Sequence, residues 1–195
     1  MYGYVNGILK SMSARKPPAS KRLAVAPMMD WTDRHCRSFH RQLSKKAVLY
    51  SEMVTTGALL HGDVPRHLDY SAAEHPLVLQ LGGSEPDDLA RCAVLAKQWG
   101  YAEIDLNCGC PSERVQRGSF GACLMAEPEL VAQCVRAMSQ ASHLPISVKQ
   151  RLGLNQMDAS ASPQDYQFAL NFILAVADAG AQQITIHARN AVLKG

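Results

Sequence analysis

Short apolar runs of strand length alternate with amphipathic segments along most of the chain, and this alternation limits the fold more than any other feature. The six runs are LAVAPM from Leu23, AVLYSEMV from Ala47, LVLQLGG from Leu77, AEIDLNCG from Ala102, PISVKQRLG from Pro145 and QITIHAR from Gln183. A repeated strand–helix–strand order predicts parallel strands that are joined by right-handed crossovers. We therefore expect an α/β protein built on one parallel sheet.

Three of the intervening segments carry apolar residues at helical spacing, in which members three, four or seven positions apart lie on one face of a helix. The stripes are Leu89, Cys92, Ala93 and Ala96; Leu130, Cys134, Ala137, Met138 and Ala141; and Tyr166, Ala169, Leu170 and Ile173. Each is preceded by a helix start signal that combines proline with acidic residues, since carboxylates favour the first turn of a helix. These signals are Pro86-Asp87-Asp88, Glu127-Pro128-Glu129 and Ser162-Pro163-Gln164-Asp165.

Two architectures fit this order, an open doubly wound sheet and a (β/α)8 barrel of the TIM type. The open sheet predicts a glycine fingerprint after the first strand, whereas this strand ends in Pro27-Met28-Met29-Asp30. The barrel predicts polar side chains at the carboxyl ends of several strands. Such residues lie on or directly after the third to sixth runs: Gln80, Asn107, Cys110, Lys149, Arg151, His187 and Arg189. The barrel is the better prediction.

The sequence supplies fewer strands than a closed barrel needs. A complete barrel has eight strands and typically about 250 residues, whereas this chain has 195 residues and six candidate strands. We therefore expect a TIM-type barrel truncated after about six strands, with residues 1–22 as a flexible tail and residues 23–195 as the incomplete barrel.

Composition excludes some classes of function and leaves others open. The net charge of +3 is compatible with a polyanionic partner without requiring one. No apolar run is long enough to span a membrane, so no membrane association is expected. The six cysteines contain no C-x-x-C pair, which argues against a metal site and for a reducing, cytoplasmic compartment.

Each polar residue at a strand end also has a structural explanation. Cys110 lies between Gly109 and Pro111 in a loop, and an ordinary thiol, protonated at neutral pH, can serve as a general acid. Lys149 has a purely structural explanation as a surface lysine whose long stem reaches water. His187 could be a core histidine and Gln80 a bridge between backbone groups, so no single residue decides the function.

Considered together, six ordered motifs resemble the tRNA-dihydrouridine synthase family, in particular its A-type branch. They are APMMDWTDRHCR, SEMVTTGALL, LVLQLGG, LNCGCPSERVQRGSFGACLM, SVKQRLG and IHARNAVLKG, and the resemblance runs from about Leu23 to Gly195. It implies an FMN-binding β/α barrel followed by a small helical domain that binds tRNA. The carboxyl-terminal barrel units and that helical domain are expected to be absent from this chain.

The resemblance assigns roles to matching positions. Pro27, Met28 and Met29 would lie against the flavin ring, and Gln80, Lys149 and His187 would contact the isoalloxazine and the ribityl chain. Cys110 matches the general acid of the family, while Asn107 and Arg189 match positions on the uridine and tRNA side. Departures from the usual family pattern occur at Cys108, Asn190 and Val192, also on that side.

The implied reaction is that of a tRNA-dihydrouridine(20/20a) synthase. NADPH reduces FMN, the flavin passes hydride to C6 of a D-loop uridine, and Cys110 protonates C5. The resemblance further implies a cytoplasmic enzyme that is monomeric when complete. Two alternatives stay open: an inactive truncated remnant of that enzyme, and another FMN barrel that acts on a free pyrimidine.

Overall fold

The computed structural model describes residues 23–155 and 162–193, so the tail expected for residues 1–22 lies outside the described residues. Its main sheet has six strands in the order β1-β2-β3-β4-β5-β7, and every neighbouring pair is parallel. The strands are β1 (Ala24–Val25), β2 (Val48–Thr55), β3 (Leu77–Gly82), β4 (Glu103–Cys108), β5 (Ile146–Gln150) and β7 (Gln183–Ile186). Each of the six apolar runs overlaps one of these strands.

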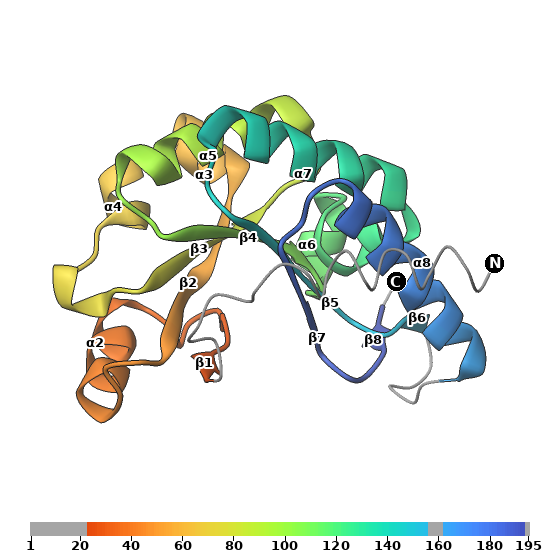
Figure 1. Cartoon of the computed structure of the whole chain (residues 1–195), viewed down its shortest axis with the longest axis horizontal. Coiled ribbons are helices and arrows are strands. Elements are labelled where there is room, and N and C mark those ends of the chain that lie inside the picture. The colour runs from red at the N-terminus through yellow and green to blue at the C-terminus, as the bar shows by residue number, and fades with distance from the viewer. Residues whose placement is uncertain (1–22, 156–161, 194–195) are drawn as a thin grey trace.

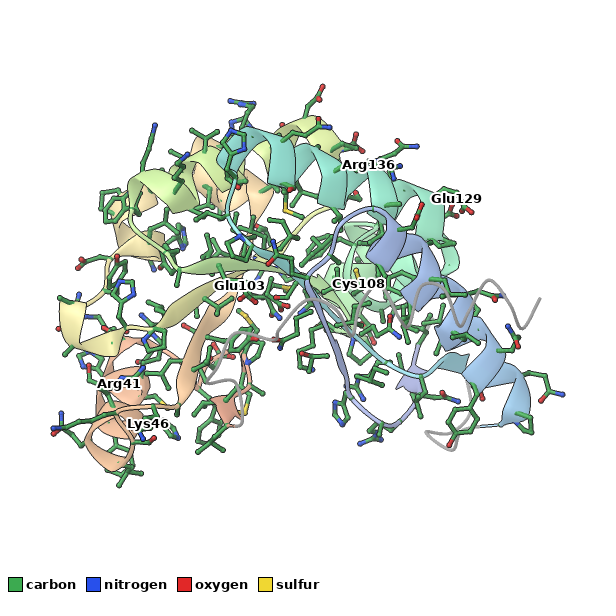
Figure 2. All side chains as sticks on the ribbon, viewed as in Figure 1. Arg41, Lys46, Glu103, Cys108, Glu129 and Arg136 are labelled. Atoms are coloured by element: carbon green, nitrogen blue, oxygen red, sulfur yellow. The ribbon has the colours of Figure 1, made fainter. Side chains whose placement is uncertain are left out.

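The sheet curls, and the helices that connect its strands cover the convex side (Figure 1). These are α3 (Thr56–His61), α4 (Val64–Leu68), α5 (Pro86–Gln98), α7 (Pro128–Ser142) and α8 (Pro163–Asp178). Glu129 and Arg136 project from α7 away from the sheet, whereas Glu103 lies on the opposite, concave side (Figure 2). Curled parallel strands with helices outside confirm the prediction of a barrel-type α/β fold with six strands.

The main core lies between the convex face of the sheet and the helices. Leu79, Ile104 and Val148 alternate along their strands with polar residues, and they join one buried cluster with Leu89 and Val135. Because successive strand residues point to opposite faces, the concave face receives the polar members of β3, β4 and β5.

The expected helical stripes are only partly correct. All four stripe residues of α5 are buried, and α7 buries Cys134 and Met138 of its expected stripe together with Val131, Ala132 and Val135. Of the expected stripe of α8, only Ala169 is buried, together with Phe172 and Val176, whereas Tyr166 and Leu170 are exposed. Its start is confirmed: Ser162 and Asp165 form a reciprocal capping box with proline in the first turn.

Several elements were not expected from the sequence. Helix α2 (Arg34–Leu43) follows β1, and α6 (Glu113–Arg117) follows the Cys110 loop. Two 3₁₀ helices, η1 (Ala72–Glu74) and η2 (Gly121–Ala126), lie before β3 and α7. A small parallel pair, β6 (Leu154–Asn155) with β8 (Ala191–Val192), lies beyond the ends of β5 and β7. In residues 23–155 and 162–193, no helix combines the length and the hydropathy that crossing a bilayer requires.

Candidate functional site

The polar face of three adjacent strands forms the floor of the site. Gln80 of β3 is paired in register with Asp105 of β4, and Asp105 is paired with Ser147 of β5. All three side chains are at most 1% exposed. One step further toward the carboxyl ends of the strands, Asn107 of β4 lies beside Lys149 of β5, and both are half-buried.

A continuous chain of hydrogen bonds joins these side chains. Ser147 Oγ donates to Asp105 Oδ1 at 2.8 Å, and Gln80 Nε2 donates to Asp105 Oδ2 at 2.7 Å. Asn107 Nδ2 in turn donates to Gln80 Oε1 at 2.9 Å. The backbone N–H groups of Gly109 and Cys110 then donate to Asn107 Oδ1 at 3.0 and 2.9 Å. A buried network whose members have partners on both sides is rigid, because each unmade bond would leave a polar group unsatisfied.

The loop after β4 presents the Cys110 thiol at the carboxyl edge of the sheet. Besides the two bonds to Asn107, the carbonyl oxygen of Cys110 accepts from the Ala122 N–H at 2.9 Å. The neighbouring Gly109 carbonyl accepts from Arg151 Nε at 3.1 Å. Cys110 is half-buried and its thiol lies 3.6 Å from the Ser112 hydroxyl, whereas Cys108 is fully buried among core residues. The two thiols therefore lie in different environments, Cys108 in the apolar core and Cys110 at the edge of the sheet.

Positive charge gathers beside this thiol. Burial lowers the pKa of Lys149, the Asp105 carboxylate opposes that shift, and Arg151 adds to it. Burial also lowers the pKa of Arg151, as does the charge of Arg189. The Cys110 thiol lies close enough to influence both Lys149 and Arg151. We call the four groups Lys149, Arg151, His187 and Arg189 the cationic cluster.

His187 belongs to the same cluster although it is exposed. Its backbone N–H donates to the Gln150 carbonyl at 2.9 Å, which ties the loop after β7 to the end of β5. Partial burial and the positive charges of Arg151, Lys149 and Arg189 lower the pKa of its imidazole. Lys149 is thus within electrostatic reach of both Cys110 and His187 at the carboxyl ends of β4, β5 and β7, a region that we call the mouth.

The loop after β1 supplies an apolar edge on the far side of the sheet. Met28 and Met29 are 44% and 49% exposed, and Pro27 is half-buried. The turn is held because the Thr32 hydroxyl accepts from the Met28 N–H at 2.9 Å and the Asp30 N–H donates to Glu52 Oε1 at 2.6 Å. Among the described strands β1 pairs with β2 alone, so these residues follow the edge strand of the main sheet that lies opposite β7.

Sequence reasoning missed Asp105 and Ser147. Both lie inside runs that were identified as strands, where an isolated polar residue looks like an ordinary interruption. A usable signal exists: each stands two residues before a predicted site residue, Asn107 and Lys149 respectively, and alternate strand residues share a face. Across the described residues, no group of three or more His, Cys, Asp or Glu side chains could hold a metal ion.

Comparison with known proteins agrees with this geometry. A family model described as dihydrouridine synthase (Dus) matches residues 24–194. A tRNA-dihydrouridine(20/20a) synthase of Xanthomonas axonopodis pv. citri is 58% identical over 177 residues, which cover 91% of this chain and 51% of the relative. Proteins of the same name from Pseudomonas putida and Yersinia pestis are 56% and 55% identical, and the matches cover 92% and 95% of this chain and 52% of each relative. The chain thus spans about half the length of these relatives.

Proposed function

Because this chain belongs to the dihydrouridine synthase family, we propose that it carries the active site of an FMN-dependent, NADPH-driven enzyme that reduces D-loop uridine in tRNA at positions 20 and 20a. One observation carries the proposal: a half-buried thiol, an amide side chain and a cluster of cations lie together at the carboxyl edge of a barrel-type sheet. That edge is where barrel enzymes place their chemistry.

The residues present fit an anionic flavin. Burial, and after it the repulsion of neighbouring positive charges, lowers the pKa values of Lys149, Arg151 and His187, so a bound anion would relieve part of an existing cost. Lys149 and His187 would hold the flavin near its polar atoms, with Gln80 beneath them. On the opposite edge, Pro27, Met28 and Met29 offer an apolar surface for the ring system. When bound, the flavin supplies hydride for the carbon–carbon double bond of uracil.

Cys110 would provide the proton that this reduction requires. Its thiol would donate to C5 of the uracil ring, on a loop whose position is fixed by the bonds from Gly109 and Cys110 to Asn107. Asn107 keeps one Nδ2 hydrogen free of the Gln80 bond and can offer it to a carbonyl of the base. Lys149 would stabilise negative charge beside the reacting ring.

The tRNA partner would be held by its phosphates. Arg114 and Arg117 are exposed on α6, directly after the Cys110 loop, and Arg189 is exposed beside His187. Guanidinium groups bind phosphate without reading sequence. A base must leave its stack to reach the thiol, which costs a few kcal/mol and least in a loop, so a D-loop uridine is a suitable substrate. We further expect the complete protein to act as a monomer in the cytoplasm.

The replacement Cys110→Ala tests the assignment. Dihydrouridine formation in tRNA should fall by about 100-fold or more, since a general acid contributes about that factor or greater. Reduction of bound flavin by NADPH should stay unchanged, because that step needs no proton from the thiol. The matched control is Cys36→Ala on α2, which should leave both rates unchanged.

Two results would count against the proposal in different ways. If Cys110→Ala loses flavin binding, the thiol has a role other than proton donation. If wild-type protein purified at its full length binds no flavin and leaves D-loop uridine unreduced with NADPH, the function itself is wrong.

A further inference from the structure

Asp105 is a fully buried carboxylate for which the reaction described above provides no use. Its side chain has no exposed surface, and it lies beneath the mouth, two residues before Asn107 on the same face of β4. Burying a charged group is costly unless hydrogen bonds repay it. Two such bonds are present, from Gln80 Nε2 and Ser147 Oγ.

In the hydrogen-bond chain that starts at Asp105, each residue donates to the residue before it. An ionised carboxylate can only accept hydrogen bonds, so the Gln80 side chain must turn its NH₂ group toward Asp105 and its oxygen toward Asn107. Asn107 must then donate with its NH₂ group to Gln80, which leaves its oxygen facing the Cys110 loop. That oxygen accepts the N–H groups of Gly109 and Cys110. The acceptor oxygen that Asp105 turns toward Gln80 thus decides the orientation of two amides and the position of the loop.

We propose that Asp105 is a positioning residue that fixes the Cys110 thiol through a one-way relay of hydrogen bonds, Asp105 to Gln80 to Asn107 to the Cys110 loop. The geometry of the relay stands by itself, whereas its catalytic meaning rests on the proposed function. Gln80 then serves mainly to orient Asn107, since its amide already bonds to two protein side chains.

The charge state of Asp105 supports the relay. Burial raises its pKa to about 6, against the lowering effect of its hydrogen bonds to Gln80 and Ser147, with Glu103 adding to the rise and Lys149 opposing it. Asp105 is therefore ionised, and purely an acceptor, at neutral pH. Ser147 has an alternative acceptor in the Ile104 carbonyl at 3.4 Å, so its hydroxyl does not depend on the carboxylate.

Because Ser147 has this alternative acceptor, two replacements of Asp105 should have different effects on the relay. In Asp105→Asn, the new amide can turn its oxygen toward Gln80 and its NH₂ group toward Ser147, whose proton moves to the Ile104 carbonyl. The relay then keeps its direction. In Asp105→Val, Gln80 loses its acceptor and its amide is free to turn over. Asn107 then loses the fixed acceptor of its NH₂ group and holds the Gly109 and Cys110 N–H groups less firmly.

The test is hydrogen exchange of the Gly109 and Cys110 amides in the intact chain, without flavin or tRNA. Asp105→Val should accelerate their exchange by about 10-fold, the protection of roughly one hydrogen bond. Asp105→Asn should restore the wild-type rate. The matched control is Ser147→Ala, which removes the other bond to the same carboxylate and should leave these two amides unchanged. Amides inside α5 report global unfolding in every variant.

Gln80→Leu provides a second route if Asp105→Val does not fold, because it cuts the relay one step later and should give the same local acceleration. The proposal is overturned if both variants leave the two amides unchanged, if Ser147→Ala accelerates them equally, or if Asp105→Asn behaves like Asp105→Val. Failure of the proposed function would appear elsewhere, as wild-type protein that forms no dihydrouridine, and would leave the exchange result intact.

Discussion

At the scale of single residues, the mouth is a site of mutually repelling cations. The pKa of His187 lies below its ordinary value of 6.5 because of partial burial and because Arg151, Lys149 and Arg189 disfavour the imidazolium. A bound anion would have the opposite effect and raise this pKa. Binding of an anionic ligand should therefore take up a proton and strengthen as the pH falls through the interval between the two values.

The replacement Lys149→Met tests this electrostatic coupling. Removing one repelling ammonium should raise the pKa of His187 toward 6.5, as measured by NMR titration of its ring protons. Lys97→Met on α5, an exposed lysine outside the cationic cluster, is the control and should leave that titration where it was. An unchanged His187 pKa in Lys149→Met would mean that the two side chains do not share a site.

At the scale of elements, the strands were predictable because they are buried almost continuously, which leaves short apolar runs in the sequence. Helix α2 was not, because its buried face consists of Arg37 and Arg41 instead of apolar residues. Arg37 pairs with the buried Glu74, and Arg41 donates to the backbone oxygens of Ser44, Ala47 and Glu74. Charged residues one helical turn apart resemble a solvated surface in a sequence.

Helix α8 shows a different limit of the sequence. Apolar residues occur on several of its faces, so both the expected stripe through Tyr166 and the observed one through Phe172 have helical spacing. The choice is made by tertiary packing against α7, which periodicity does not contain. The site residues at strand ends were recognisable from topology. Asp105 and Ser147 look like ordinary polar interruptions of a strand unless their spacing of two residues from Asn107 and Lys149 is noticed.

Gly121, the first residue of the 3₁₀ helix η2, lies against the backbone of the Cys110 loop. Gly121 has a φ of +74°, and a Cβ there would lie 2.7 Å from the Cys110 carbonyl oxygen and against Val115. Gly180 has a φ of +104° with open space around it. Replacing each of these two glycines by alanine in a separate variant distinguishes backbone strain from steric overlap.

Gly121→Ala should be the more destabilising change. Both variants force alanine into a left-handed backbone conformation, which destabilises the fold by about 1–2 kcal/mol. Gly121→Ala adds the destabilisation of overpacking, typically about 1–3 kcal/mol. Thermal unfolding of both variants measures the difference, and the first should also slow dihydrouridine formation because it displaces the Cys110 backbone. Equal melting temperatures and equal activity would contradict this view of the loop.

At the scale of the whole molecule, the two faces of the sheet carry different kinds of side chain. The convex face is apolar and holds the helices, whereas the concave face carries Gln80, Glu103, Asp105, Asn107 and Ser147. Barrel interiors are usually filled by branched apolar residues, so polar residues there indicate a binding floor. In the described structure β1 and β7 are the edge strands. The expectation that residues 23–195 form an incomplete FMN-binding barrel stays a prediction.

The central claim is that the mouth around Cys110 serves the reduction of uridine in tRNA. Its most direct test is mass spectrometry of D-loop dihydrouridine in tRNA from cells in which the gene is intact, deleted, or restored as wild type or as Cys110→Ala. We predict that dihydrouridine at positions 20 and 20a disappears on deletion and returns only with the wild-type gene. Unchanged dihydrouridine after deletion, or full restoration by Cys110→Ala, would contradict the claim.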